Sequence, residues 1–89
     1  MKRNVEALEV AEQAIDIDSN NVESYNNKSW ALNVLKRYEE ALEAAEQAIQ
    51  LDPNFAYAYQ SKHWALTGLG KTAEAEQAYQ RARELGYQW

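Results

Sequence analysis

The chain has 89 residues, of which 46% are hydrophobic and 26% charged, with a net charge of −5 and no cysteine. This length and composition predict one small folded domain rather than a disordered segment. The acidic balance argues against binding to a nucleic-acid backbone, and the lack of cysteine excludes a disulfide framework, a thiolate nucleophile and a cysteine-ligated zinc site.

Two further observations bear on where the protein acts. No apolar stretch is long enough to cross a bilayer, and no apolar run that would form a signal peptide follows the basic residues near the start. The predicted helical surfaces are acidic, whereas a helix that lies on a membrane needs a basic polar face. We therefore expect a soluble cytoplasmic protein that binds neither nucleic acid nor membrane.

Helix-breaking residues are few, since proline occurs once and glycine three times. Apolar residues spaced three and four apart predict helices throughout the chain. The turn residues divide it into five predicted helices, at about 5–17, 22–35, 38–51, 55–69 and 72–86. Pro53 ends the third helix, Gly70 follows the fourth, and Thr72 is expected to cap the fifth. Short turns imply that successive helices are antiparallel.

The sequence repeats at a spacing of 34 residues. The segment 7–15, ALEVAEQAI, returns at 41–49 as ALEAAEQAI. Identical residues also recur later in the period, as the pairs Tyr25 and Tyr59, Lys28 and Lys62, and Trp30 and Trp64. A fixed period of this length indicates one helical unit stacked on copies of itself, so that each copy buries its apolar face against a neighbour.

This pattern resembles the tetratricopeptide repeat, a helix–turn–helix unit of about 34 residues. The resemblance rests on residue types at fixed positions of the unit. They are an early aromatic (Tyr25 and Tyr59), a small residue after it (Ser29), a bulky residue that follows (Leu32 and Leu66), two alanines of the second helix (Ala41 and Ala75, Ala48 and Ala82) and a late proline (Pro53). The resemblance implies an all-α, right-handed α-solenoid of antiparallel helix pairs. Residues 1–21 would form the second helix of an incomplete unit, followed by full units at 22–55 and 56–89.

Two departures from the family pattern matter. His63 occupies a position where the family prefers a small residue, so we expect the helix pairing of the last unit to be looser or tilted. Lys28 and Lys62 stand where leucine is frequent. Their stems are expected to lie along the core while the ammonium groups reach water.

In this family the first helix of each unit lines a concave groove. Carried over by repeat position, the groove would include Asn26, Asn27, Trp30, Asn33, Tyr57, Gln60, Trp64 and Thr67. The two tryptophans are the main candidates for contact, because tryptophan is enriched among binding hot spots, although each could instead pack between neighbouring first helices. The amides could bond a peptide backbone or form a solvated face. The groove positions carry no arginine, so a clamp on peptide carboxylates is not expected, and a ligand with apolar or aromatic side chains fits better.

Catalytic chemistry has little support in the sequence. His63 is the only histidine, and it stands at a packing position without a nucleophile partner. Glu39, Glu43 and Glu46 could touch a divalent ion, but a solvated helix face is the better interpretation because no oxygen-rich loop completes a coordination shell. We expect no enzymatic activity, no cofactor and no bound metal.

The end helices are expected to expose apolar side chains: Ala7, Leu8, Ala11 and Ile15 at one end, and Tyr79, Ala82 and Leu85 at the other. Two hypotheses follow. The chain is a protein–protein interaction scaffold that binds a peptide or partner helix in its groove. Alternatively, it is a self-assembling module that forms homo-oligomers through its end helices. In either case it could be an excised or engineered piece of a longer array.

Overall fold

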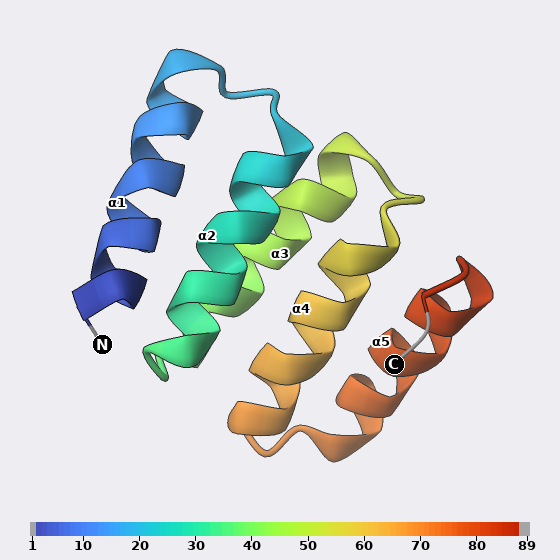
Figure 1. The fold of residues 1–89 in the computed structure, drawn as a ribbon. Coiled ribbons are helices and arrows are strands. Elements are labelled where there is room, and N and C mark those ends of the chain that lie inside the picture. The colour runs from blue at the N-terminus through green and yellow to red at the C-terminus, as the bar shows by residue number, and fades with distance from the viewer. Residues whose placement is uncertain (1, 88–89) are drawn as a thin grey trace.

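The computed structural model describes residues 2–87, and Met1, Gln88 and Trp89 lie outside the described residues. Over this range the chain forms five α-helices (Figure 1). They are α1 (Lys2–Ile17), α2 (Val22–Val34), α3 (Tyr38–Leu51), α4 (Ala56–Gly68) and α5 (Thr72–Glu84). The predicted all-α fold of sequential antiparallel helix pairs is confirmed, and the helix bounds differ from the predicted ones by a few residues.

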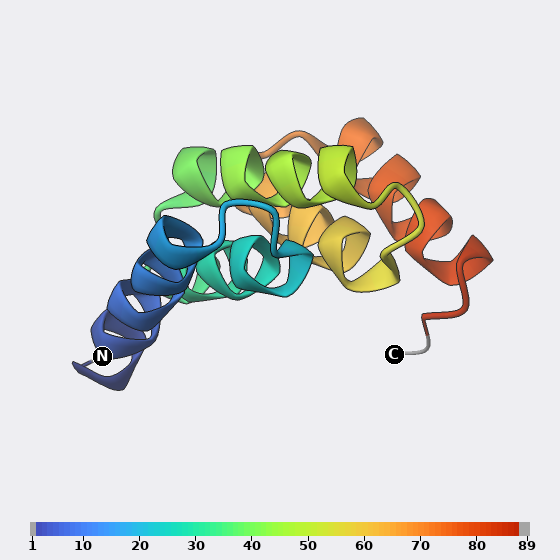
Figure 2. The ribbon, with the colours of Figure 1, turned by 90° about the horizontal axis from the view of Figure 1, so that it is seen from above.

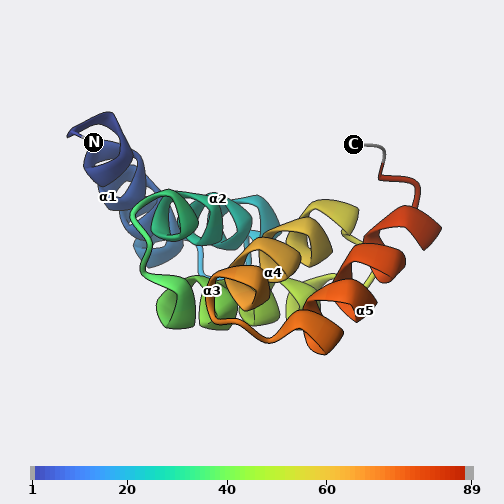
Figure 3. The same cartoon turned by 90° about the horizontal axis from the view of Figure 1, so that it is seen from below.

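The helices are arranged in two rows. In the views from above and below, α1, α3 and α5 follow an arc around α2 and α4 (Figures 2 and 3). Helix α2 contacts α1, α3 and α4, and α4 also contacts α3 and α5. Each inner helix, α2 or α4, is therefore held between outer helices, and the two inner helices lie side by side.

Small residues let the helices approach closely. Four alanines of α3 are at most 1% exposed: Ala41, Ala44, Ala45 and Ala48. Leu32 and Leu66 are the largest fully buried side chains of the inner helices, and they belong to different core clusters. Leu42 packs against both clusters. The cluster of Leu32 also contains Ala65 of α4, so Leu42 and Ala65 together join the two repeat units into a continuous core, as expected of a stacked array.

The turns that end the inner helices share one backbone geometry. Lys36 and Gly70, which are 34 residues apart, have φ angles of 62° and 77°. The next N–H donates back to a helix carbonyl in both turns, from Arg37 to Leu32 at 2.8 Å and from Lys71 to Leu66 at 2.9 Å. This hydrogen-bond pattern satisfies carbonyls at a helix end and requires a left-handed residue, usually glycine. Lys36 adopts that conformation despite its side chain.

Helix starts are less uniform than helix ends. Asn21 caps α2 by accepting a hydrogen bond from the Ser24 N–H at 3.2 Å. The expected cap at Thr72 is wrong, because Thr72 is the first residue of α5, and the capping position is Lys71, which makes no side-chain hydrogen bond there. Helix α5 therefore begins one residue earlier than a cap at Thr72 would place its start.

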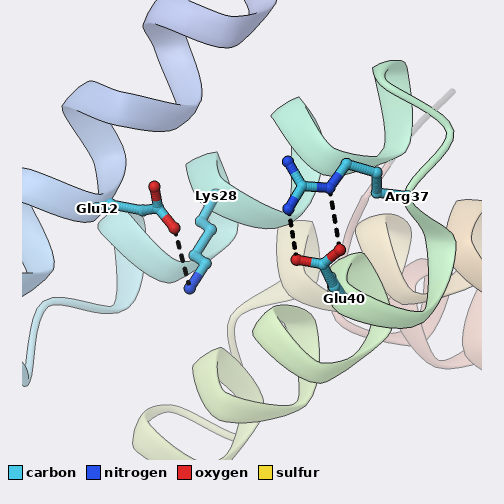
Figure 4. Close-up of polar contacts among 4 residues, drawn as sticks. All are labelled: Glu12, Lys28, Arg37 and Glu40. Atoms are coloured by element: carbon cyan, nitrogen blue, oxygen red, sulfur yellow. Dashed lines mark hydrogen bonds and ion pairs between the residues drawn. The ribbon is translucent and has the colours of Figure 1, made fainter.

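Ion pairs repeat with the same period. Lys28 Nζ lies 3.8 Å from Glu12 Oε2, and Lys62 Nζ lies 3.7 Å from Glu46 Oε2. Each pair ties an inner helix to the preceding outer helix, as the first pair shows in Figure 4. The lysine side chains are 28% and 30% exposed, so their stems are mostly covered while their charges are paired at the surface. Such partly exposed pairs contribute at most about 1 kcal/mol each.

A second contact in Figure 4 joins Arg37 to Glu40 at the start of α3. The guanidinium donates two hydrogen bonds to the carboxylate, at 2.9 and 2.7 Å. These hydrogen bonds lower the pKa of Glu40 and raise the pKa of Arg37. The negative charge of Glu40 in the first turn also faces the positive end of the helix dipole.

Candidate groove on the inner helices

A hollow of about 390 Å³ lies between α2 and α4, and we call it the central groove. Its lining residues are Trp30, Asn33 and Val34 of α2, Tyr38 of α3, and Trp64, Thr67 and Gly68 of α4. Four of the eight predicted groove residues thus meet in one place, namely Trp30, Asn33, Trp64 and Thr67.

The two tryptophans are half exposed. Trp30 is 50% exposed and Trp64 is 48% exposed, although the neighbouring residues Ala31 and Ala65 are fully buried. Each ring therefore packs partly against the protein and leaves a comparable area open beside the central groove. Such rings offer apolar contact area to a partner, and they lose less conformational entropy on binding than a long flexible side chain does.

The amides of this surface connect the inner helices to each other. Asn33 Nδ2 donates to the Ser61 backbone carbonyl at 3.0 Å, and the Ser61 hydroxyl donates to Asn26 Oδ1 at 2.8 Å. These bonds account for two amides that the sequence left as either ligand contacts or a solvated face. Asn33 Oδ1 is buried and has no hydrogen-bond partner among the described residues. The amide therefore keeps one unused acceptor at the groove.

Tyr38 is the one lining residue that comes from an outer helix, and the sequence reasoning missed it. Its ring lies against Gly68, where an added Cβ would overlap ring carbons including Cγ. One repeat earlier the position of Gly68 is filled by Val34, and one repeat later the position of Tyr38 is filled by Thr72. A glycine at a position otherwise filled by a side chain was the available signal, because it marks a close approach.

The other predicted groove residues lie elsewhere. Asn27 lines a separate hollow between α1 and α2. Tyr57 lines a third hollow with residues that follow α5, and its ring packs edge-on against Tyr87 at a centroid distance of 5.3 Å. Gln60 is half-buried on α4 and lines none of these three hollows. The predicted groove is therefore divided among several hollows along the inner helices.

The predicted exposure of the end helices needs correction. Leu8, Ala11 and Ala82 are buried, at 6%, 4% and 0% exposed, because α2 packs on α1 and α4 packs on α5. The remaining four predicted residues are half-buried: Ala7, Ile15, Tyr79 and Leu85. Self-association through these residues stays a prediction.

His63 has a structural contact that repeats an earlier one. The Ser29 hydroxyl donates to the Ala41 carbonyl at 2.7 Å, and His63 Nδ1 donates to the Ala75 carbonyl at 3.0 Å. The imidazole thus carries its proton on Nδ1 and performs the role of the hydroxyl one repeat earlier. Ala75 is only 3% exposed, so the helix pair stays closed around the larger side chain instead of loosening.

Residues 2–87 hold no group of three or more histidine, aspartate or glutamate side chains placed to bind a metal ion. Over the same residues, no helix is both long and apolar enough to span a membrane.

Comparison with known proteins agrees with this geometry. A family model described as tetratricopeptide repeat matches residues 22–55. No curated protein matches the chain. Among solved structures, the second TPR of Spaghetti (RPAP3) bound to the HSP90 peptide SRMEEVD is 32% identical, with a TM-score of 0.88 over 92% of this chain and 76% of that one. The second TPR domain of human RPAP3, in complex with the HSP70 peptide SGPTIEEVD, is 30% identical, with a TM-score of 0.89 over 96% of this chain and 71% of that one.

The Arabidopsis OM64 TPR domain shares the fold at 24% identity, with a TM-score of 0.92 over 96% of this chain and 70% of that one. The repeated contacts, the family model and the identity to the RPAP3 domain agree with one another. The chain belongs to the tetratricopeptide repeat family.

Proposed function

We propose that this domain is a non-catalytic protein-interaction module that binds a peptide or a partner helix in the central groove. The observation that carries the proposal is the pair of half-exposed tryptophans, Trp30 and Trp64, on either side of one hollow. Aromatic residues around a hollow are typical of binding hot spots, since they supply contact area at low conformational cost.

Charge favours a ligand without acidic anchoring groups. Among the described residues that line the central groove, none is lysine or arginine. The lysines of α2 and α4 point to the outer helices, where they pair with Glu12 and Glu46. The peptides bound to the RPAP3 domains end in EEVD, and their carboxylates would meet no cation in this hollow. We infer that the central groove selects apolar or aromatic side chains.

Asn33 supports a second element of recognition. Its Nδ2 is committed to Ser61, and its buried Oδ1 has no donor among the described residues. A buried acceptor left unpaired costs roughly 1–3 kcal/mol. A peptide N–H that reaches this oxygen after a small local shift recovers that cost, and it displaces no donor of the protein.

The test is a selection from a random peptide library on the immobilised protein, followed by titration of the selected peptides and of SRMEEVD. We expect aromatic or aliphatic residues in the selected peptides and no saturable binding of SRMEEVD. Trp30→Ala combined with Trp64→Ala should abolish binding with little change in the fold, because both rings are half exposed.

Leu51→Ala provides the matched control. Leu51 is a partly exposed apolar residue, at 39%, but it stands on α3 and does not line the central groove. This variant should bind the selected peptides as the unchanged protein does. Normal binding by the double tryptophan variant, with helicity retained in circular dichroism, would show that the groove assignment is wrong.

A further inference from the structure

The central groove lies where both inner helices end. Among its lining residues, Asn33 and Val34 are the last two residues of α2, and Thr67 and Gly68 are the last two of α4. The two helices run in the same direction and end on the same side of the molecule (Figure 1). Because the carbonyl end of an α-helix carries a partial negative charge, the negative potential of two helix ends adds up at this hollow.

The lining offers no positive charge to offset this potential. The last turns of α2 and α4 hold no basic residue, and no lysine or arginine is among the described residues that line the hollow. Lys36 and Lys71 follow these helices, but both are exposed and neither lines the hollow. The positive end of α3, which begins at Tyr38, is offset by Glu39 and Glu40 in its first turn. The central groove, in a chain of net charge −5, is therefore suited to a cation.

Two polar groups of the lining are hydrogen-bond acceptors. Thr67 donates its hydroxyl hydrogen to the His63 carbonyl at 2.8 Å, so its oxygen can only accept further bonds. Asn33 Oδ1 has no donor among the described residues, and an amide oxygen has two lone pairs. The peptide N–H proposed above therefore leaves acceptor capacity for a second donor from the ligand.

Three aromatic rings complete the lining, those of Trp30, Tyr38 and Trp64. The face of an aromatic ring attracts cations, and tryptophan attracts them most strongly. The guanidinium of arginine is planar, stacks on such faces and carries five N–H donors with no acceptor. The ammonium of lysine is more strongly hydrated and cannot stack. Among cationic side chains, arginine thus matches both the rings and the acceptors of this hollow.

We propose that the central groove binds an arginine side chain of a partner protein, with the guanidinium beside Trp30 and Trp64. This inference rests on the proposed function, and it adds one cationic residue to the apolar or aromatic side chains expected there. The hollow of about 390 Å³ has room for such a combination, since ligand pockets span roughly 300–1,000 Å³. The apolar stem of arginine adds contact with the same rings.

The probes are peptides selected from the random library, each synthesised with arginine, citrulline or lysine at the same position and titrated by fluorescence anisotropy. We expect one recurrent arginine in the selected peptides. Citrulline keeps the shape of arginine without its charge, so it should weaken binding by about tenfold. Lysine keeps the charge without the planar group, and it should weaken binding by about fivefold.

Val34 allows the charge of the hollow to be changed with little effect on the core, because it is a lining residue that is 42% exposed. Val34→Glu should strengthen binding of the arginine peptides, and Val34→Lys should weaken it, each by roughly two- to fivefold. Val5 provides the matched control, since it is 44% exposed and stands on α1 outside the central groove. Val5→Glu and Val5→Lys change the net charge equally and should leave the affinity unchanged.

The outcomes separate this inference from the proposed function. Equal binding of the citrulline or lysine peptides would overturn the assignment to arginine, as would equal affinities of Val34→Glu and Val34→Lys. Selected peptides that lack a recurrent arginine, but lose binding to the double tryptophan variant, would overturn this inference and leave the proposed function standing. Peptides that bind the double tryptophan variant normally, or a selection that yields no binder, would overturn both.

Discussion

Gly68 and Tyr38 provide a sharp test of the packing at the central groove. In Gly68→Ala, the new methyl group would lie closer than 3.0 Å to several carbons of the Tyr38 ring. Because Cγ is one of these carbons, rotation of the ring about its own axis does not relieve the overlap, and the whole ring must swing away. Overpacking of this kind costs about 1–3 kcal/mol. Alanine in place of glycine in a helix returns up to about 1 kcal/mol.

We therefore expect Gly68→Ala to destabilise the protein by about 1 kcal/mol, although the change raises helix propensity. In a Tyr38→Ala background the overlap is absent, and Gly68→Ala should stabilise by up to about 1 kcal/mol. The coupling in this double-mutant cycle is then about 2 kcal/mol, well above the few tenths expected for independent sites. Urea unfolding of the four proteins measures it. Stabilisation by Gly68→Ala in both backgrounds would refute the close contact.

Two other changes test single residues. Lys36→Gly should stabilise the fold by about 0.5–1 kcal/mol in urea unfolding. The left-handed backbone at φ 62° costs a residue with a side chain about 1–2 kcal/mol, and the larger conformational entropy of glycine in the unfolded chain offsets part of the gain from removing that cost. An unchanged free energy of unfolding would contradict the strain. The hydrogen bond from Arg37 lowers the pKa of Glu40. The ionised Glu40 therefore stabilises the fold at pH values above the ordinary glutamate pKa, and this stabilisation is lost as the pH falls through the lowered pKa. Glu40→Gln should therefore lose less stability between neutral and acid pH than the charge-matched Glu43→Gln; equal losses would argue against the contact.

The fold could be predicted because period, residue size and turn chemistry agree. Ala41 and Ala48 recur at fixed positions, and only small residues permit the close helix approach that buries them at 0% exposure. The missed details are local. Thr72 has the chemistry of a cap, but it lies one residue inside α5. Lys36 takes a left-handed turn without glycine, since the hydrogen bond from Arg37 to Leu32 requires that geometry whatever residue is present.

The candidate site was less accessible to sequence reasoning. The resemblance places Asn26, Asn33 and the tryptophans on the inner helices, but it does not say which amides are already bonded. That depends on Ser61, whose hydroxyl and carbonyl engage both asparagines across the gap between α2 and α4. Contacts between units are set by the superhelical geometry, and a single period does not encode them. The same limit explains why Tyr38, an outer-helix residue, was not expected at the groove.

The outer helices α1 and α5 differ in the apolar residues that they carry at equivalent repeat positions. Leu8 of α1 and Leu42 of α3 share a repeat position, and both pack into the core. The next residue in the series is Glu76, which is exposed. The apolar pattern that drives stacking is thus interrupted at α5 and preserved at α1, and the preserved end is the one with an open Val10. If hydrophobic burial drives association of this domain, then new contacts are favoured at the α1 face and at the tryptophans of the inner helices, and disfavoured at the charged face of α5.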